Sequence, residues 1–172
     1  MDYPNRHAVG WWYDAAPEGC ILHGTRSGES RSIHDELIAT ATWAAGEPYY
    51  IDWETGQRVY LAWHVTIGEG EIACHLPLNR WGWHAGSHSR RWFGAEFAQP
   101  TGDDPITDLQ VQTFCWWWRN VVRKRWPGVP DHFLGHSEVR QGINAGKTDP
   151  YTVGSPEMDN LRRRILSLVN GG

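Results

Sequence analysis

The amino-acid sequence predicts a three-layer α/β fold in which helices flank a central mixed β-sheet, built as one domain over residues 1–172. Short apolar runs typical of strands alternate with segments of helical periodicity, the order expected when helices pack on a sheet. A hairpin near the middle of the chain requires antiparallel pairing, so the sheet is expected to be mixed. No repeat, low-complexity tract or linker interrupts the chain, and its length suits a single core.

The first elements expected are a strand and a helix. The apolar run 20–23 stops at the polar, glycine-containing segment 24–28, which predicts a buried strand with His23 at its end. Apolar residues then recur at helical spacing over 32–45, and Ser32 is the expected N-cap.

A hairpin and a further strand follow. Segments 58–67 and 71–76 contain alternating apolar residues and are separated by Gly68-Glu69-Gly70, which predicts two paired strands. Segment 91–97 also alternates, with its apolar side chains on one face and Glu96 on the other. The expected inward residues of that strand are Phe93, Ala95 and Phe97.

Two helices complete the expected fold. Thr107 and Gln110 form a capping-box pattern ahead of a helix that ends before Pro127-Gly128. Ser155-Pro156 opens a last helix, with proline at its tolerated first position. Inward faces are expected from Val111, Phe114, Cys115, Trp118 and Val122 in the first helix, and from Met158, Leu161, Ile165 and Leu168 in the second.

Composition narrows the functional classes. The formal net charge of −4 gives no basic field for a phosphate backbone, which excludes nucleic acid as an expected partner. No apolar run suits a signal peptide or a membrane span, so we expect a chain made in the cytoplasm without membrane insertion. We also expect a monomer. The three cysteines, Cys20, Cys74 and Cys115, match no metal knuckle or disulfide framework and are expected to be buried thiols.

Tryptophan is unusually frequent, with 12 residues. Trp81, Trp83 and Trp92 lie among glycines and histidines, as in clefts that stack aromatic faces against sugars or peptides. Core packing is the expectation for the run 116–118.

Several side chains could form a metal site with a general base. His136 follows the apolar Phe133-Leu134 and precedes Lys147 and Asp149, while His23 ends a distant strand. Histidine and aspartate are ligands of divalent metals, and a lysine can stabilise developing negative charge. Glu96 needs a partner or a task on its apolar strand, such as taking a proton from metal-bound water, unless that strand is a solvated edge. The pairs His84/His88 and His132/His136 have helical ligand spacing, but a glycine inside each pair disfavours a helix.

Five segments, in this order, resemble the zinc-dependent N-acetylmuramoyl-L-alanine amidases of the amidase-2 type, a group of AmpD-like enzymes, phage endolysins and peptidoglycan recognition proteins. The similarity is carried by Ile21-Leu22-His23-Gly24-Thr25, Trp63-His64-Val65-Thr66-Ile67, Trp83-His84-Ala85-Gly86, Gly94-Ala95-Glu96, and Gly135-His136-Ser137-Glu138 with Lys147-Thr148-Asp149-Pro150. It covers nearly the whole chain and implies the family's three-layer fold.

The resemblance implies a role for each matching residue. Zn²⁺ would be bound by His23, His136 and Asp149, with Glu96 as general base and Lys147 stabilising the oxyanion. Substrate would be bound by His84 and Trp83 of the matching loop. Thr25 and Arg80 are further candidates for the cleft, the arginine because it can grip stem-peptide carboxylates; a surface role is the alternative for Arg80.

The sequence also departs from the family pattern. Gly24 stands where a second histidine is often found, and Trp63 replaces a tyrosine that some phage members place near the zinc. Asp149 occupies a position where other members carry cysteine. The connection 140–146 is longer than usual and Tyr151 replaces a common glycine, which affects the expected placement of Lys147.

The expected function is zinc-dependent hydrolysis of the amide bond between N-acetylmuramic acid and L-alanine in peptidoglycan, as in a phage-type endolysin. One alternative is a cytoplasmic amidase that recycles muropeptides, and another is a non-catalytic peptidoglycan-binding module. A glycosidase using Glu96 with Asp103 or Asp104 is a third alternative, which leaves the histidines unexplained.

Overall fold

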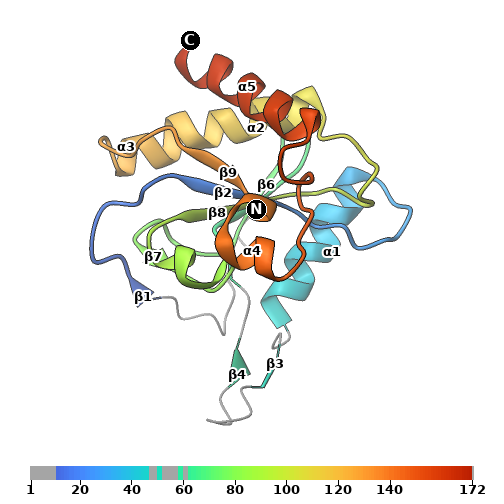
Figure 1. Ribbon diagram of the computed structural model, residues 1–172, viewed down its shortest axis with the longest axis horizontal. Helices are drawn as coiled ribbons and strands as arrows, with labels where there is room; N and C mark the ends of the chain where they lie inside the picture. The colour runs from blue at the N-terminus through green and yellow to red at the C-terminus, as the bar shows by residue number, and fades with distance from the viewer. Residues whose placement is uncertain (1–10, 47–49, 52–57, 60–61, 172) are drawn as a thin grey trace.

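The computed structural model describes residues 11–46, 50–51, 58–59 and 62–171. Its centre is a five-stranded sheet with the order β6-β5-β8-β2-β9 (Figure 1). Strands β5, β8, β2 and β9 are parallel, and β6 pairs antiparallel with β5, so the expected mixed sheet is confirmed. The strands are β2 (Cys20–Gly24), β5 (Val65–Ile67), β6 (Ile72–Cys74), β8 (Phe93–Phe97) and β9 (Phe133–Gly135).

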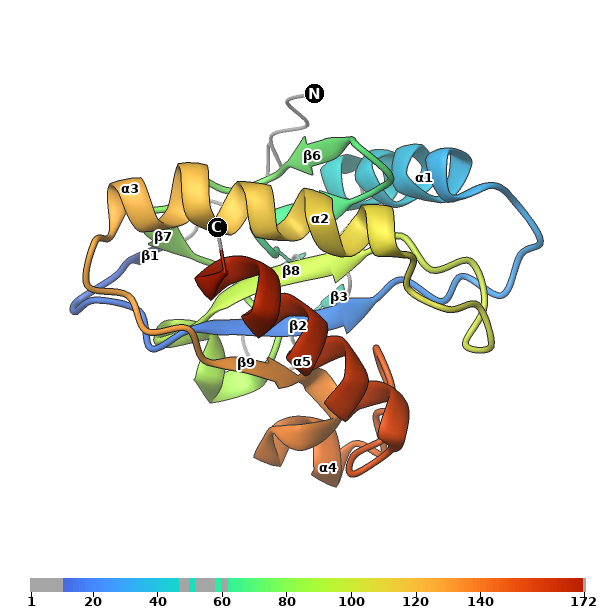
Figure 2. The same ribbon diagram turned by 90° about the horizontal axis from the view of Figure 1, so that it is seen from above.

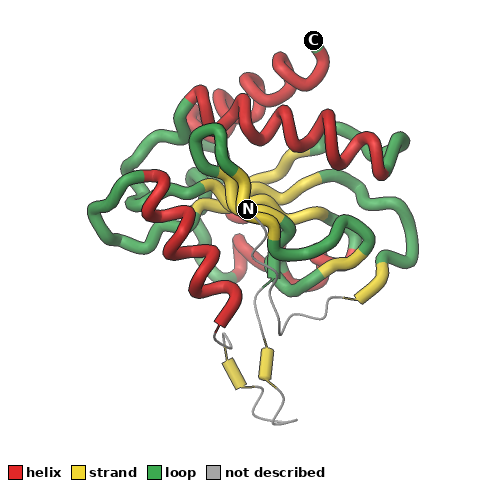
Figure 3. The backbone as a smooth tube through the Cα atoms, turned by 180° about the vertical axis from the view of Figure 1, so that it is seen from behind, coloured by secondary structure: helices red, strands yellow, loops and turns green. Residues whose placement is uncertain are grey.

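Helices lie on both sides of this sheet, which confirms the three layers. Figure 2 shows α2 (Asp108–Trp117) and α5 (Pro156–Asn170) lying across one face, and α2 continues through a π-helical turn, Trp118–Val122, into the short α3 (Arg123–Arg125). Helix α1 (Ile33–Gly46) lies on the opposite side (Figure 3), and α4 (Arg140–Asn144) follows β9. None of the helices described is both long and apolar enough to span a bilayer.

Alternation along the strands separates the core from the opposite, polar face. Cys20 and Leu22 of β2, with the predicted inward residues of β8, pack into the main hydrophobic core beneath α2 and α5. The intervening side chains of the same strands face the other way, as predicted for Glu96. Strand register places Glu96 between His23 of β2 and Thr66 of β5, so three polar side chains form a row across this face.

The helix signals in the sequence are confirmed at the N-termini. Thr107 and Gln110 form the predicted capping box, and the hydroxyl of Ser155 accepts from the Met158 amide at the start of α5. Ser32 accepts from the Asp35 amide at the start of α1. The predicted helical stripe of α2 and its π-turn is buried throughout.

Two predictions of burial were wrong. Leu168 is 41% exposed, and Val169 fills the core in its place because the helical face turns slightly along α5. Trp116 is 57% exposed, because consecutive residues of α2 cannot all face the sheet. Its neighbours Trp117 and Trp118 are buried as expected, and the three cysteines are free thiols, of which Cys74 is only partly buried.

The strand predicted over 58–67 is divided in the structure. Val65–Ile67 forms the predicted hairpin with β6, whereas β4 (Arg58–Val59) pairs with β3 (Tyr50–Ile51) in a separate sheet, and residues 60–61 lie outside those described. Another small sheet that the sequence did not predict pairs β1 (Trp11–Trp12) with β7 (Arg80–Trp81). Strands of two residues carry too little alternation to be recognised from sequence.

His64 is a buried structural histidine that makes the fold sensitive to acid. Its Nε2 donates to the carbonyl of Arg80 at 2.9 Å, and its Nδ1 accepts from the amide of Gly94 at 3.1 Å. Burial lowers the pKa of His64 to about 4, because the charged imidazolium would lose its hydration and the two backbone contacts do not compensate for that loss.

We expect His64 to destabilise the fold as pH falls. Between an unfolded pKa near 6.5 and the folded value, the unfolded chain binds a proton that the folded chain does not, so stability decreases on acidification by up to about 3 kcal/mol. Urea unfolding with chelator present measures the free energy of unfolding at neutral pH and at pH 4. Between these pH values that free energy should fall less for His64→Asn than for the wild type. Equal losses in the two proteins would contradict this explanation.

Candidate active site

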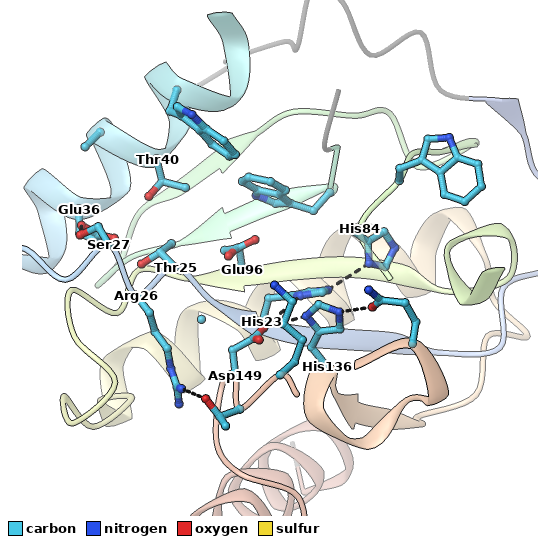
Figure 4. A pocket seen from close by; sticks show the side chains of 18 of the residues that line it. His23, Thr25, Arg26, Ser27, Glu36, Thr40, His84, Glu96, His136 and Asp149 are labelled. Atoms are coloured by element: carbon cyan, nitrogen blue, oxygen red, sulfur yellow. Dashed lines mark hydrogen bonds and ion pairs between the residues drawn. The ribbon is translucent and has the colours of Figure 1, made fainter. Parts of the chain in front are cut away.

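A cavity of about 820 Å³ opens on the polar face of the sheet beside α1. It gathers most of the residues that the sequence singled out, from β2, β8 and the loops after β7 and β9 (Figure 4). Those lining it are His23, Thr25, Trp83, His84, Glu96, His136, Lys147 and Asp149. Arg80 is not among its lining residues, because its guanidinium lies over the ring of Trp12 at 4.2 Å.

Three of these side chains converge on one point of the cavity. The Nδ1 atoms of His23 and His136 lie 3.3 Å and 3.1 Å from the same Oδ2 atom of Asp149. One ligand atom from each of the three lies within 4.8 Å of the other two. Ligand bonds of about 2.0–2.1 Å in a tetrahedral zinc site give ligand separations of about 3.3 Å, so these spacings suit zinc.

Hydrogen bonds on the far sides of the rings determine which nitrogen carries the proton. His84 Nε2 lies 3.2 Å from the Trp92 carbonyl oxygen, which can only accept, so His84 Nδ1 is the acceptor for His23 Nε2–H at 3.1 Å. His136 Nε2 donates in the same way to the amide oxygen of Gln141 at 2.7 Å. Both Nδ1 atoms therefore present lone pairs to Asp149 when the rings are neutral.

This arrangement is complementary to a cation. Burial lowers the pKa of His23, although Asp149 opposes this shift. The lowered pKa favours the neutral ring. Burial by itself would raise the pKa of Asp149, but the pKa is lowered overall, because either ring donates to this carboxylate whenever its Nδ1 carries a proton. Two imidazole lone pairs and a carboxylate oxygen would repel one another without a positive charge between them, and two nitrogens with one oxygen form a catalytic type of zinc ligand set.

The segment that carries Asp149 is held by several hydrogen bonds. The Ser137 amide donates to the Asp149 carbonyl at 3.1 Å, and the Ser137 hydroxyl donates to the Tyr151 carbonyl at 2.7 Å. Arg26 donates to the Thr148 hydroxyl and to the Pro150 carbonyl, both at 2.6 Å. The ligand-bearing loop is thus fixed to the end of β2 and to the turn after β9.

The long connection before Lys147 is compact. Residues Arg140–Asn144 form α4, and the Lys147 amide donates to the Gly142 carbonyl at 2.9 Å. Lys147 lines the cavity with an exposed side chain. Although burial dominates the pKa shifts of His23 and Glu96, the positive charge of the Lys147 ammonium lowers the pKa of both.

Glu96 stands beside this group on the cavity floor (Figure 4). Burial, reinforced by the charge of Asp149, raises the pKa of Glu96 to about 8. A carboxyl group with such a pKa can exchange protons near neutral pH, as a general acid and base must. Thr25, by contrast, exchanges hydrogen bonds with the backbone of Gln99 and joins the ends of β2 and β8.

The geometry excludes the two local histidine pairs as metal sites. Both ring nitrogens of His84 are engaged, by His23 and by the Trp92 carbonyl, so it cannot bind a metal together with His88. The ring nitrogens of His136 face Asp149 and Gln141, whereas His132 is exposed, so these two histidines do not form a metal site together.

Sequence reasoning missed Gln141 and Arg26, which position the ligands. Neither residue belongs to a sequence motif. Arg26 bonds to Thr148 and Pro150, which are distant in sequence, and Gln141 of α4 bonds to His136, which precedes that helix. Only the short separation of five residues between Gln141 and His136 could have suggested this contact from the sequence.

We expect His84 to control zinc affinity. Replacing it with alanine removes the acceptor that orients His23, and losing such an outer partner weakens metal binding by about 10- to 100-fold. Competition with a chromophoric chelator measures the affinity. His75→Ala, at an equally buried histidine bonded to Thr66, is the matched control and should bind zinc normally. Wild-type affinity in His84→Ala would refute the orienting role.

Comparison with known proteins agrees with this geometry. A model of the N-acetylmuramoyl-L-alanine amidase family, amidase-2 type, matches residues 13–152. The chain belongs to this amidase family. Its enzyme class is therefore N-acetylmuramoyl-L-alanine amidase, and the activity that this class implies is hydrolysis of an amide bond in peptidoglycan. No curated protein sequence matches the chain significantly.

Solved structures share the amidase fold along almost the whole chain. AmpD matches with a TM-score of 0.68 at 20% identity, covering 99% of this chain and 94% of AmpD. The amidase LysC from Clostridium intestinale URNW matches with a TM-score of 0.61 at 17% identity, covering 96% of both chains. Human PGRP-IBETAC, solved in complex with a glycosamyl muramyl pentapeptide, has a TM-score of 0.58 at 14% identity, covering 81% of this chain and 84% of the human one.

Proposed function

We propose that this amidase is a zinc enzyme that cleaves the bond between N-acetylmuramic acid and L-alanine in intact cell wall, as an endolysin does. The observation that carries the zinc proposal is the convergence of two imidazole lone pairs and a carboxylate oxygen from His23, His136 and Asp149. Zinc bound there would supply a Lewis acid that acidifies a water molecule and polarises the substrate carbonyl.

The protein's own groups supply the proton transfers and orientation. Glu96, as a carboxylate, takes a proton from the attacking water and returns it to the departing alanine nitrogen. The Lys147 ammonium stabilises the negative charge that develops on the carbonyl oxygen. His84 and Gln141 hold the two imidazoles in the orientation that binds metal.

The rival functions fit the cavity less well. A peptidoglycan-binding module needs neither a complete ligand set nor a buried acid beside it. A glycosidase needs a second carboxylate facing Glu96, but neither Asp103 nor Asp104 lines the cavity, and Asp104 instead caps a turn by accepting from Thr101.

Chelation tests the zinc amidase proposal. Purified peptidoglycan is digested with zinc-loaded protein, with chelator-treated protein and after zinc is restored, and new amino termini and reducing ends are quantified. We expect L-alanine amino termini that disappear with chelator and return with zinc. New reducing ends would favour a glycosidase, and sedimentation with walls without any product would favour the binding module.

The endolysin assignment rests on the character of the cavity rim. Trp83 of the cavity wall contacts Trp81, on which the exposed Trp11 stacks, and an aromatic rim of this kind suits a long polymer better than a small soluble fragment. The alternative is a recycling amidase that acts on soluble muropeptides. Loss of turbidity of bacteria with permeabilised outer membranes supports the endolysin, and activity restricted to soluble muropeptides would overturn it.

A further inference from the structure

Two tryptophans continue the wall of the cavity outward from Trp83. The Trp81 ring lies edge-on to Trp83 at a centroid distance of 5.4 Å, and Trp11 stacks on Trp81 at 4.6 Å with an interplanar angle of 26°. Trp11 also lies edge-on to Trp83 at 6.1 Å. We call Trp11, Trp81 and Trp83 the tryptophan ledge.

The ledge is held by the small sheet of β1 and β7, which Figure 1 shows beside each other at one side of the molecule. Trp11 and Trp81 are directly opposite in this antiparallel pair, so their side chains share a face. The Arg90 guanidinium lies 5.5 Å from the Trp81 ring. Trp81 is buried, but Trp11 remains 53% exposed, so an indole stacked on Trp81 faces solvent beside the cavity.

The opposite face of the same two strands is built differently. Trp12 follows Trp11 and points away from it, because successive side chains of a strand alternate. Its ring packs against the guanidinium of Arg80 at 4.2 Å, and it is 58% exposed. The two strands therefore offer two exposed indoles, of which Trp11 belongs to the ledge that reaches the cavity.

Building on the proposed function, we propose that the tryptophan ledge binds sugar rings of the glycan strand next to the muramic acid whose amide bond is cleaved. Trp83 makes the ledge continuous with the cavity that holds Glu96 and the metal-binding group. A hexosamine ring has an apolar face of C–H groups that packs flat on an indole, and its hydroxyls can accept from a guanidinium such as that of Arg90.

Charged residues elsewhere in the cavity agree with a substrate whose glycan strand lies on the ledge and whose stem peptide lies in the cavity. Outside the ledge the cavity is also lined by Arg26 and Arg31, whose guanidinium groups suit the carboxylates of a stem peptide. The aromatic ledge, which Arg90 borders as a hydrogen-bond donor, suits the hydroxyls and apolar faces of a glycan. A partner protein or a second copy fits less well, because a stable interface needs about 800 Å² on each side and the exposed part of the ledge is one indole with its border.

Sugar binding without any amide bond tests the ledge directly. The probe is a β-1,4-linked hexamer of N-acetylglucosamine, titrated by calorimetry into the full-length protein with and without zinc. We expect Trp11→Ala to weaken binding about tenfold, the effect of losing one stacked ring. Trp11→Tyr retains a ring and should recover most of the affinity, which separates stacking from a failure of β1 to fold.

Two matched controls remove an exposed indole elsewhere. Trp12→Ala changes the same strand on its opposite face, and Trp116→Ala changes α2 on the other side of the sheet; both should bind the hexamer like the wild type. An equal loss in Trp12→Ala would overturn the proposal, because the effect would then belong to the strand pair. No binding by the wild type, or a Trp11-dependent change in oligomeric state or vesicle binding, would also overturn it.

Kinetics connect the ledge to catalysis. In Trp11→Ala, the kcat/KM for uncrosslinked glycan strands with stem peptides should fall about tenfold relative to that for a single muramyl sugar with the same peptide. An unchanged ratio would overturn the ledge while leaving the amidase function intact. Failure of both substrates with the wild type would refute the amidase function, and the hexamer titration would still decide the ledge.

Discussion

Replacing Glu96 with glutamine should reduce amide hydrolysis by about 10²- to 10⁴-fold, the contribution of a positioned general acid and base. Glutamine matches the size of the protonated acid, which burial favours by raising the Glu96 pKa to about 8, so the fold and the zinc content should be retained. Steady-state kinetics on a muramyl peptide, with metal analysis of the same sample, measure both quantities.

Glu36→Gln is the matched control for this experiment. Glu36 is also a buried carboxylate in the cavity wall, but it bonds to Ser27 and Arg31 at the start of α1 and lies outside the metal-binding group. Its loss should leave turnover of a muramyl dipeptide close to that of the wild type. Full activity in Glu96→Gln, or an equal loss in both variants, would contradict the assignment of Glu96 as the base.

Asp149→Asn should abolish zinc binding and activity together. The substitution removes the negative charge that both imidazole nitrogens face, and we expect a loss of affinity beyond the roughly 100-fold that an outer partner can cost. Asp149→Cys supplies a thiolate, a good zinc ligand, and should recover metal binding. Equilibrium dialysis with zinc measures all three proteins.

The outcome that would contradict this ligand assignment is an asparagine variant that keeps stoichiometric zinc and turnover. Circular dichroism of each metal-free variant provides the folding control. Loss of zinc in a variant that remains folded isolates the ligand role from the stability of the loop that Ser137 and Arg26 hold.

The layers of the fold and most of the cavity residues could be predicted because their signals are local. The run that ends at His23, the alternation around Glu96 and the capping residue Thr107 each depend on neighbours in sequence. These patterns place the side chains on the correct strand and face. Five motifs in family order then indicate which of them come together.

The partners of the ligands could not be predicted, because they arise from contacts across the fold. The sequence suggested that His84 contacts substrate, yet its Nδ1 lies 3.1 Å from Nε2 of His23 in β2. Its expected contact with substrate remains a prediction. Gln141 lies on a short helix where the sequence indicated an irregular connection. Arg80 was assigned to the cavity from its chemistry, but cross-strand pairing with Trp12 directs it elsewhere.

The position of the cut shows whether the enzyme cleaves the amide bond between N-acetylmuramic acid and L-alanine. Peptidoglycan is digested by the zinc-loaded protein in ¹⁸O-labelled water, and the products are analysed by tandem mass spectrometry. We expect one heavy oxygen on the lactyl carboxylate of N-acetylmuramic acid and an unlabelled peptide that begins with a free L-alanine amine. Heavy oxygen at a sugar reducing end, or on a carboxylate within the peptide, would contradict it.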